Sequence, residues 1–531
     1  MIQRRSGLAA SIFLSVVTLM AATLPAIGGS LTPEQARGQQ LYLTGQSLGG
    51  SPIQAYVGAT SVPLPGRVLP CVNCHGANGK GRPEGGVIPS NITWPQLTKG
   101  YGVVSASGRR YPPYDETALA RAITQGVDSA GTALDNAMPR FTMAAEDVAD
   151  LTAYLKVIDS LLDPGLAPDS IRLGILVPAS RDPNALGQVI VALFRAYFDD
   201  INAAGGVYNR QLVLIEQSVE AESGILEGGK ALVERQVFAL LGAMSAGQGR
   251  LFGELMERMQ VPSIGPLTAF SDDNDSLNRY SFYLLAGTGV QQRALLDYAV
   301  KHVPRSDPRA VILHPQQADS VAIADLLQAQ AALHGWTQVQ TLGYPAAQLD
   351  ATALVLQLQH AGIETLFFLG QGLDLQQLAA AAGQQGWTPT LFLSGTQAAQ
   401  GLFDMPLGFA GRVFAVYPTL PTDLTPSGQQ EFQRFHRRHG LSRHYLRTQI
   451  SAYASAHLLL KGLKTAGRNL SREKLLAALE GLYQYQTGLT PKLTFGPNQH
   501  LGANGAYIVA VNPKTGTFNG VGEWVVPKRL R

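Results

Sequence analysis

The stretch Cys71-Val-Asn-Cys-His75 contains both cysteines of the 531-residue sequence. Two thiols separated by two residues and followed by a histidine form the attachment sequence of a c-type haem. Each thiol adds to one vinyl group of the porphyrin, and the imidazole of His75 reaches the iron from the same turn. We therefore predict one covalently attached haem c on Cys71 and Cys74, with His75 as an axial ligand of the iron.

Three other roles for this motif fit the sequence less well. A disulfide between Cys71 and Cys74 would close a tight loop and cross-link almost nothing. A thioredoxin-like pair follows a strand and opens a helix, whereas this motif follows a Pro/Gly-rich stretch at 63–70 and enters a glycine-rich loop at 75–81. A structural zinc site needs four ligands, and this neighbourhood offers three besides scattered acidic residues.

Two helical patterns lie on either side of the motif. Thr32, followed by Pro33, is typical of a helix start, and apolar residues spaced by three and four predict a helix over 143–162. Two terminal helices around a haem motif resemble class I cytochromes c. The resemblance implies an all-α cytochrome domain over residues 30–165.

In class I cytochromes a glycine and an aromatic residue of the first helix pack closely on the last helix. The residues of this sequence that match are Gly38 and Tyr42, against Leu151 and Tyr154. We expect these four residues to form the helix crossing.

The sixth iron ligand follows from the residues available. His75 is the only histidine between residues 30 and 165, and Met138 and Met143 are the only methionines there. Met138 precedes a proline, which favours an extended backbone, and class I cytochromes carry their axial methionine in a similar Met-Pro context. We predict Met138 as the ligand, a choice that raises the reduction potential, and expect Met143 to pack in the core.

The N-terminus has the pattern of a signal peptide. Arg4 and Arg5 precede an apolar run over 8–24 and a small-residue exit over 25–30. We predict that residues 1–29 direct export to the periplasm and that the mature chain does not insert stably in the membrane. The apolar run is close to the shortest membrane span, so an uncleaved anchor is the alternative.

The length suggests two or three domains. A net charge of +3 is nearly neutral for 531 residues and argues against a nucleic-acid partner. Proline, glycine and aspartate within 163–170 predict a domain boundary. We place a linker at 166–170 and a second domain at 171–531.

The second domain alternates strand-type and helical segments. Strand-type runs lie at 171–177, 212–216, 237–242 and 261–265, with helical patterns at 186–203, 225–235 and 250–259 between them. A second series of strand-type runs lies at 310–314, 337–342, 365–370 and 390–394. This alternation predicts parallel sheets covered by helices. Two successive series predict two lobes, with a ligand bound beyond the carboxyl ends of the strands.

Four stretches carry a resemblance to a known family: Arg172-Leu-Gly-Ile-Leu-Val-Pro178, Asp200-Ile-Asn-Ala-Ala-Gly-Gly206, Leu241-Gly-Ala-Met-Ser245 and Val261-Pro-Ser-Ile-Gly-Pro266. They resemble type I periplasmic binding proteins, in particular the leucine/isoleucine/valine-binding receptors of ABC transporters. The resemblance implies an α/β two-lobed domain that binds a small molecule between its lobes.

The resemblance also suggests ligand-binding residues. In the first lobe they are Ser245, Gln248, Thr268 and Phe270. For these residues and for the second-lobe residues that follow, an ordinary loop role without ligand contact is the alternative. In the second lobe they are Gln371 and Thr396, which fall where amino-acid receptors place an aromatic residue and an acid for the α-ammonium group. Because neither expected residue type is present, a ligand other than an amino acid is favoured.

The sequence contains no nucleophile elbow, phosphate loop or dinucleotide fingerprint. It therefore predicts an electron carrier joined to a solute receptor, with a redox protein as its partner. The alternative is an ABC-transporter substrate-binding protein for amino-acid-like or other small solutes, whose cytochrome is an accessory redox or docking module. A haem enzyme would need an open iron site, which Met138 as a ligand would close.

Overall fold

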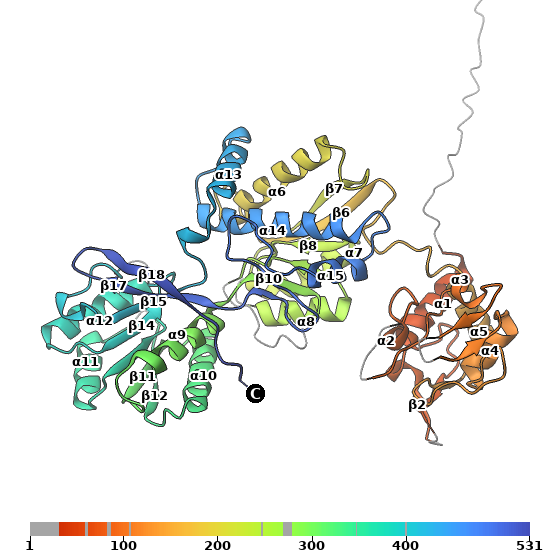
Figure 1. Ribbon diagram of the computed structural model, residues 1–531, viewed down its shortest axis with the longest axis horizontal. Coiled ribbons are helices and arrows are strands. Elements are labelled where there is room, and N and C mark those ends of the chain that lie inside the picture. Colours follow the sequence, from red (N-terminus) through yellow and green to blue (C-terminus); the bar gives the residue numbers. More distant parts are fainter. Residues whose placement is uncertain are drawn as a thin grey trace, which may run out of the picture. The chain divides into compact units, whose positions relative to one another are not determined.

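The computed structural model describes residues 31–58, 62–81, 86–105, 108–245, 248–268, 279–346, 348–398 and 401–530. The chain divides into two compact units, Met1–Leu161 and Leu162–Arg531, shown in red to orange and in yellow to blue in Figure 1. The predicted signal peptide lies outside the described residues. Within the described residues, no helix is long and apolar enough to span a membrane.

Short helices build the first unit. They are α1 (Pro33–Thr44), α2 (Cys71–His75), α3 (Trp94–Leu97), α4 (Glu116–Thr124) and α5 (Ala145–Leu155). Thr32 caps α1 as predicted, since its hydroxyl accepts a hydrogen bond from the Gln35 N–H while the Gln35 side chain accepts one from the Thr32 N–H. The core of this unit, called the first-unit core below, includes Leu41, Tyr42, Leu97, Leu119, Phe141, Leu151, Tyr154 and Ile158.

The tightest contact in the first unit lies between α1 and α5. A Cβ atom added at Gly38 would lie 2.0 Å from the carbonyl oxygen of Asp150. The rings of Tyr42 and Tyr154 are 5.4 Å apart, and Arg37 binds the Asp150 carboxylate through two nitrogens at 2.6 and 2.8 Å. The predicted crossing of the terminal helices is confirmed.

The first unit is not purely helical. Its short strands are β1 (Gln54–Tyr56), β2 (Leu64–Pro65), β3 (Val103–Val104), β4 (Arg110–Tyr111) and β5 (Arg140–Thr142). They form a sheet of order β2-β1-β5 and a β3-β4 pair. Strands of two or three residues are too short to show an alternating pattern, so the expectation of an all-α domain missed them. Helix α5 also ends at Leu155, and turns continue the chain so that Ile158 stays buried.

The first lobe of the second unit has one sheet with parallel pairing, in the order β16-β10-β9-β8-β6-β7. Its strands are β6 (Ser170–Pro178), β7 (Gln211–Val219), β8 (Ala239–Leu241), β9 (Ser263–Ile264), β10 (Ser281–Leu285) and β16 (Leu501–Ala503). Its helices are α6 (Leu186–Ala203), α7 (Ile225–Glu234), α8 (Gly249–Met259), α13 (Pro426–Arg438), α14 (Leu446–Ala466) and α15 (Arg472–Glu480). The predicted strand and helix series of this lobe is confirmed.

Alternate strand residues face opposite helical layers, as strand geometry requires. Ile175 and Leu241 pack in the core formed with α6, α14 and α15, whereas Leu176 and Leu240 pack with α7 and α8. Figure 1 shows α14, from late in the sequence, beside α6. The first lobe therefore draws on two distant parts of the chain.

The second lobe has a sheet of order β12-β11-β13-β14-β15-β17-β18. Its strands are β11 (Ala310–Pro315), β12 (Val339–Tyr344), β13 (Thr365–Phe368), β14 (Thr390–Ser394), β15 (Val413–Tyr417), β17 (Ala506–Asn512) and β18 (Thr517–Val525). β11–β15 pair in parallel, and β17 and β18 add antiparallel. The covering helices are α9 (Thr288–His302), α10 (Ala318–Leu333), α11 (Ala351–His360) and α12 (Gly372–Gln384).

The chain crosses between the lobes after β10, after β15 and after β16. Each crossing leaves the carboxyl end of a parallel strand. The carboxyl edges of the two sheets therefore both lie toward the crossings and face each other. In parallel α/β sheets this edge is where ligands bind.

Arg472, at the start of α15, joins several segments of the first lobe. Its guanidinium donates hydrogen bonds to the carbonyl oxygens of Val237, Phe238 and Gln260 at 2.7, 3.0 and 3.0 Å. Its backbone N–H donates to the carboxylate of Asp163. The residues that lead into β6 are thereby attached to the sheet.

We predict that Gly38→Ala destabilises the first unit by about 1–3 kcal/mol, because its new methyl group meets backbone rather than a flexible side chain. Thermal unfolding of the full haem-loaded chain, followed by haem absorbance, measures the change. Gly100→Ala is the matched control, since a Cβ atom there has no neighbour within 4 Å. Equal melting temperatures for the two variants would contradict the close crossing.

Candidate haem and ligand-binding sites

The haem-attachment motif forms its own short helix. Helix α2 begins at Cys71, directly after Pro70, and ends at His75. The hydroxyl of Tyr42 donates a hydrogen bond of 2.5 Å to the carbonyl oxygen of Gly76. The crossing of the terminal helices thus also fixes the turn that follows the motif.

His75 is arranged as an iron ligand should be. Its side chain is 6% exposed, and its Nδ1 lies 2.9 Å from the carbonyl oxygen of Ser90. Ligating histidines commonly donate their second ring N–H to such a carbonyl, which fixes the ring and leaves Nε2 for the metal. Burial lowers the pKa of His75 and so favours the neutral imidazole that binds iron.

The two thiols of the motif are not bonded to each other. Both cysteines are free, Cys71 partly buried and Cys74 exposed. Burial raises the pKa of the Cys71 thiol to about 12. Redox-active cysteine pairs instead have a lowered thiol pKa. The donor set of Cys71, Cys74 and His75 therefore fits a covalent haem.

Met138 lies on the loop between α4 and α5. Its half-buried side chain packs against the first-unit core, as Cys71 and Met143 do. The loop is held by the guanidinium of Arg140, which donates to the carbonyl oxygens of Met138 and Leu134. The role of Met138 as the sixth ligand stays a prediction.

Ser90 and Arg140 also belong to this site and were not predicted from the sequence. Ser90 contributes a backbone carbonyl, so its residue type carries no signal. Arg140 follows the Met138-Pro139 pair closely. Its position beside that pair is the feature of the sequence that could have indicated its role. Among the described residues, no group of three histidine, cysteine, aspartate or glutamate side chains could hold a further metal ion.

The first-lobe ligand candidates lie at the carboxyl edge of its sheet. Ser245 is buried beyond β8, and its carbonyl accepts a 2.7 Å hydrogen bond from the N–H of Gln248, the residue that precedes α8. Thr268 follows β9. Phe270 lies outside the described residues.

The second-lobe candidates lie at the facing edge. Gln371 is exposed and precedes α12, just after β13. Thr396 is exposed, and its Oγ1 lies 3.0 Å from the Oγ of Ser394, the last residue of β14. The structure thus places the described candidates at facing strand ends, and their contact with a ligand stays a prediction.

Two tyrosines at the second-lobe edge were missed from the sequence. Tyr344 ends β12 and donates a 2.7 Å hydrogen bond to Asp374, while Tyr417 ends β15 beside Gly395. The sequence feature that could have identified them is an aromatic residue at the end of a strand. The run predicted at 337–342 stopped two residues short of Tyr344, and β15 was not predicted.

These features define a two-lobed solute-binding fold preceded by a c-type cytochrome module. The family described as periplasmic binding protein matches residues 170–517, and the family described as cytochrome c matches residues 68–159. The chain belongs to the periplasmic binding protein family and carries an N-terminal cytochrome c domain. A cytochrome c domain implies covalent haem c, and members of both families are usually not enzymes.

Curated relatives match the binding domain. The Leu/Ile/Val-binding protein BraC3 of Rhizobium johnstonii is 24% identical over 364 residues, 65% of this chain and 92% of the relative. The Leu/Ile/Val-binding protein homolog 3 of Brucella melitensis is 24% identical over 248 residues, and the match spans 44% of this chain and 66% of the relative. The second domain is therefore related to Leu/Ile/Val-binding proteins.

Solved structures show the same fold. A type 1 periplasmic binding protein from Bordetella pertussis Tohama I superposes with a TM-score of 0.51 at 17% identity, covering 67% of this chain and all 100% of its own. A possible leucine/isoleucine/valine-binding protein from Rhodopirellula baltica SH 1 gives 0.50 at 15% identity, covering 68% of this chain and 98% of its own. At these identities the likeness shows the fold alone.

We predict that Cys71→Ala/Cys74→Ala removes covalent haem, because both bonds to the porphyrin are lost. Denaturing mass spectrometry of the full-length protein measures the attached haem, and the wild type should carry the mass of one haem. Each single variant should retain at most one thioether bond. Met143→Ala is the control and should keep the full haem mass. Covalent haem on the double variant would rule out this attachment site.

Proposed function

We propose that the protein is a periplasmic mono-haem cytochrome fused to a receptor that binds a small molecule between its lobes. The observation that carries the proposal is that one chain contains both a haem-attachment helix with a buried, oriented histidine and a complete two-lobed binding fold. The haem would supply one-electron transfer, and the receptor would recognise a solute.

In the cytochrome module, we assign a separate role to each residue at the haem site. Cys71 and Cys74 would hold the porphyrin, and His75 and Met138 would bind the iron. Ser90 orients His75 through its carbonyl oxygen, and Arg140 holds the backbone of the Met138 loop. With both axial positions filled by protein, the module would transfer electrons rather than bind a substrate at iron.

In the receptor, we propose that the solute is a small carboxylate-bearing molecule. The N-terminus of α8 lies beside Ser245 and Gln248, and the backbone N–H groups at a helix N-terminus favour a carboxylate. Thr268 completes this side, and Gln371 and Thr396 face it from the second lobe. Thr396 stands where an amino-acid receptor places its acid, so an α-ammonium group would have no partner there.

A transport receptor that delivers its solute to an ABC permease is the second candidate function. The relatives named as Leu/Ile/Val-binding proteins favour it. In that case the cytochrome would be an accessory redox or docking module. Loss of solute uptake on deletion of the gene, with electron transfer unchanged, would favour this candidate over the first.

We predict that Met138→Ala lowers the reduction potential by on the order of 0.1 V or more, since axial ligands shift haem potentials over a range of about 0.8 V. The variant should also bind an added exogenous ligand, because one coordination position opens. Spectroelectrochemistry of the full chain measures both changes. Met143→Ala should leave the potential and spectrum as in the wild type, and an unchanged Met138→Ala would refute the axial assignment.

We predict that 4-methylpentanoate, which is leucine without its ammonium group, raises the melting temperature of the haem-loaded protein more than leucine does. Gln371→Ala should weaken this binding about tenfold, equivalent to about 1.4 kcal/mol. Gln357→Ala, an exposed glutamine of α11 on the same lobe, is the control. A stronger response to leucine would show that another group replaces the missing acid.

A further inference from the structure

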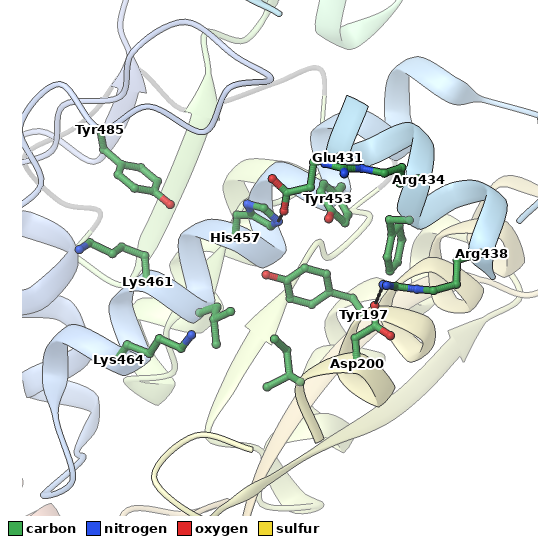
Figure 2. Close-up of a pocket in the computed structure, with 13 residues that line it drawn as sticks. Tyr197, Asp200, Glu431, Arg434, Arg438, Tyr453, His457, Lys461, Lys464 and Tyr485 are labelled. Carbon is green, nitrogen blue, oxygen red and sulfur yellow. Dashed lines mark hydrogen bonds and ion pairs between the residues drawn. The ribbon is translucent and has the colours of Figure 1, made fainter. Parts of the chain in front are cut away.

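A cavity of about 590 Å³ lies on the first lobe among α6, α13 and α14 (Figure 2). Most of its lining residues come from the second half of α6, from α13, and from α14 between Tyr453 and Lys464, whereas Ser455, which contacts Gly265 at the carboxyl edge of the sheet, is not among them. None of the ligand candidates within the described residues lines it. The cavity is therefore a separate site, and its volume falls within the range of about 300–1,000 Å³ typical of small-molecule pockets.

Aromatic side chains form the wall of this cavity. Tyr197, Phe435 and Tyr453 are buried, and the ring of Tyr453 lies 5.4 Å from Tyr197 and 4.8 Å from Phe435. Figure 2 shows the hydroxyl ends of Tyr197 and Tyr485 directed toward the same space. Burial raises the pKa of both phenols, so both hydroxyls remain hydrogen-bond donors. The wall suits a flat apolar ring with a polar group at its edge.

Among the described residues, the acidic side chains that line the cavity have cationic or histidine partners, whereas several of its basic side chains do not. Asp200 is engaged by Arg438 and His439, and Glu431 lies 3.8 Å from Nε2 of His457. Arg434, Lys461 and Lys464 also line the cavity, and no ion pair within the described part of the chain engages them.

These free cations favour an anion. The carboxylates of Glu431 and Asp200 on the same lining oppose a multiply charged one. Both lysines reach the cavity from α14, the helix that also carries Tyr453.

We propose that this cavity binds a small aromatic monocarboxylate. Its ring would lie against Tyr197, Tyr453 and Tyr485, and its carboxylate would face Lys461 and Lys464. A neutral aromatic molecule would form no ion pair with the ammonium groups, and an aliphatic acid would make no ring contact with the aromatic wall. The proposal does not rest on the function assigned to the strand-end site.

The test is isothermal titration of the full haem-loaded protein with phenylacetate. Two matched probes separate the contributions: 2-phenylethanol lacks the charge, and cyclohexylacetate lacks the aromatic ring. We expect phenylacetate to bind at least tenfold more tightly than either. No measurable binding of phenylacetate, or equal affinity for all three probes, would overturn the proposal.

Variants locate the binding. Lys461→Gln/Lys464→Gln should weaken phenylacetate at least tenfold and bring its affinity close to that of 2-phenylethanol. Lys230→Gln, an exposed lysine of α7 on the same lobe, is the charge control and should have no effect. Tyr485→Leu should remove the preference over cyclohexylacetate, with circular dichroism confirming the fold.

The strand-end site is tested in parallel with Gln371→Ala. If that variant weakens phenylacetate and the lysine variant does not, phenylacetate binds between the lobes and the proposal fails. If phenylacetate binding follows only the lysine variant, the cavity site stands whatever ligand the strand ends bind.

Discussion

The order of the first lobe depends on a single guanidinium, that of Arg472. It supplies donors to three carbonyl oxygens, those of Val237 and Phe238 just before β8 and that of Gln260 just after α8. A buried carbonyl group that loses its only donor costs about 1–3 kcal/mol. Asp163 balances its charge and at the same time ties the entry to β6. This junction holds the amino end of β8, the strand whose carboxyl end leads to Ser245.

Regular elements could be predicted where the pattern is local. The runs at 310–314 and 390–394 became β11 and β14 because continuous apolar residues are typical of strands buried on both faces. Gly38 and Tyr42 were found because a close helix crossing demands a small residue at one point. The β2-β1-β5 sheet could not be predicted, since it pairs residues 54–56 with residues 140–142, far apart in sequence.

The sites divide in the same way. Cys71, Cys74 and His75 were recognisable because their chemistry requires fixed spacing along the chain. The cavity beside α6 gave no such signal, because Tyr197, Glu431, Tyr453 and Tyr485 come together only through the fold. The carbonyl of Ser90 is likewise invisible in sequence, since every residue has one. Residues constrained by local spacing could be predicted from the sequence, and contacts between distant segments could not.

The three chain crossings also determine how the lobes can move. β10 and β16 are neighbours in one sheet, and β15 and β17 are neighbours in the other, so the crossings that join them run close together. One connection would allow the lobes to twist freely. Several connections along one line form a hinge, which resists twisting and sliding of the lobes but permits bending. Capture of a solute would then involve a rotation of the two lobes about this hinge, with each lobe moving as a rigid body.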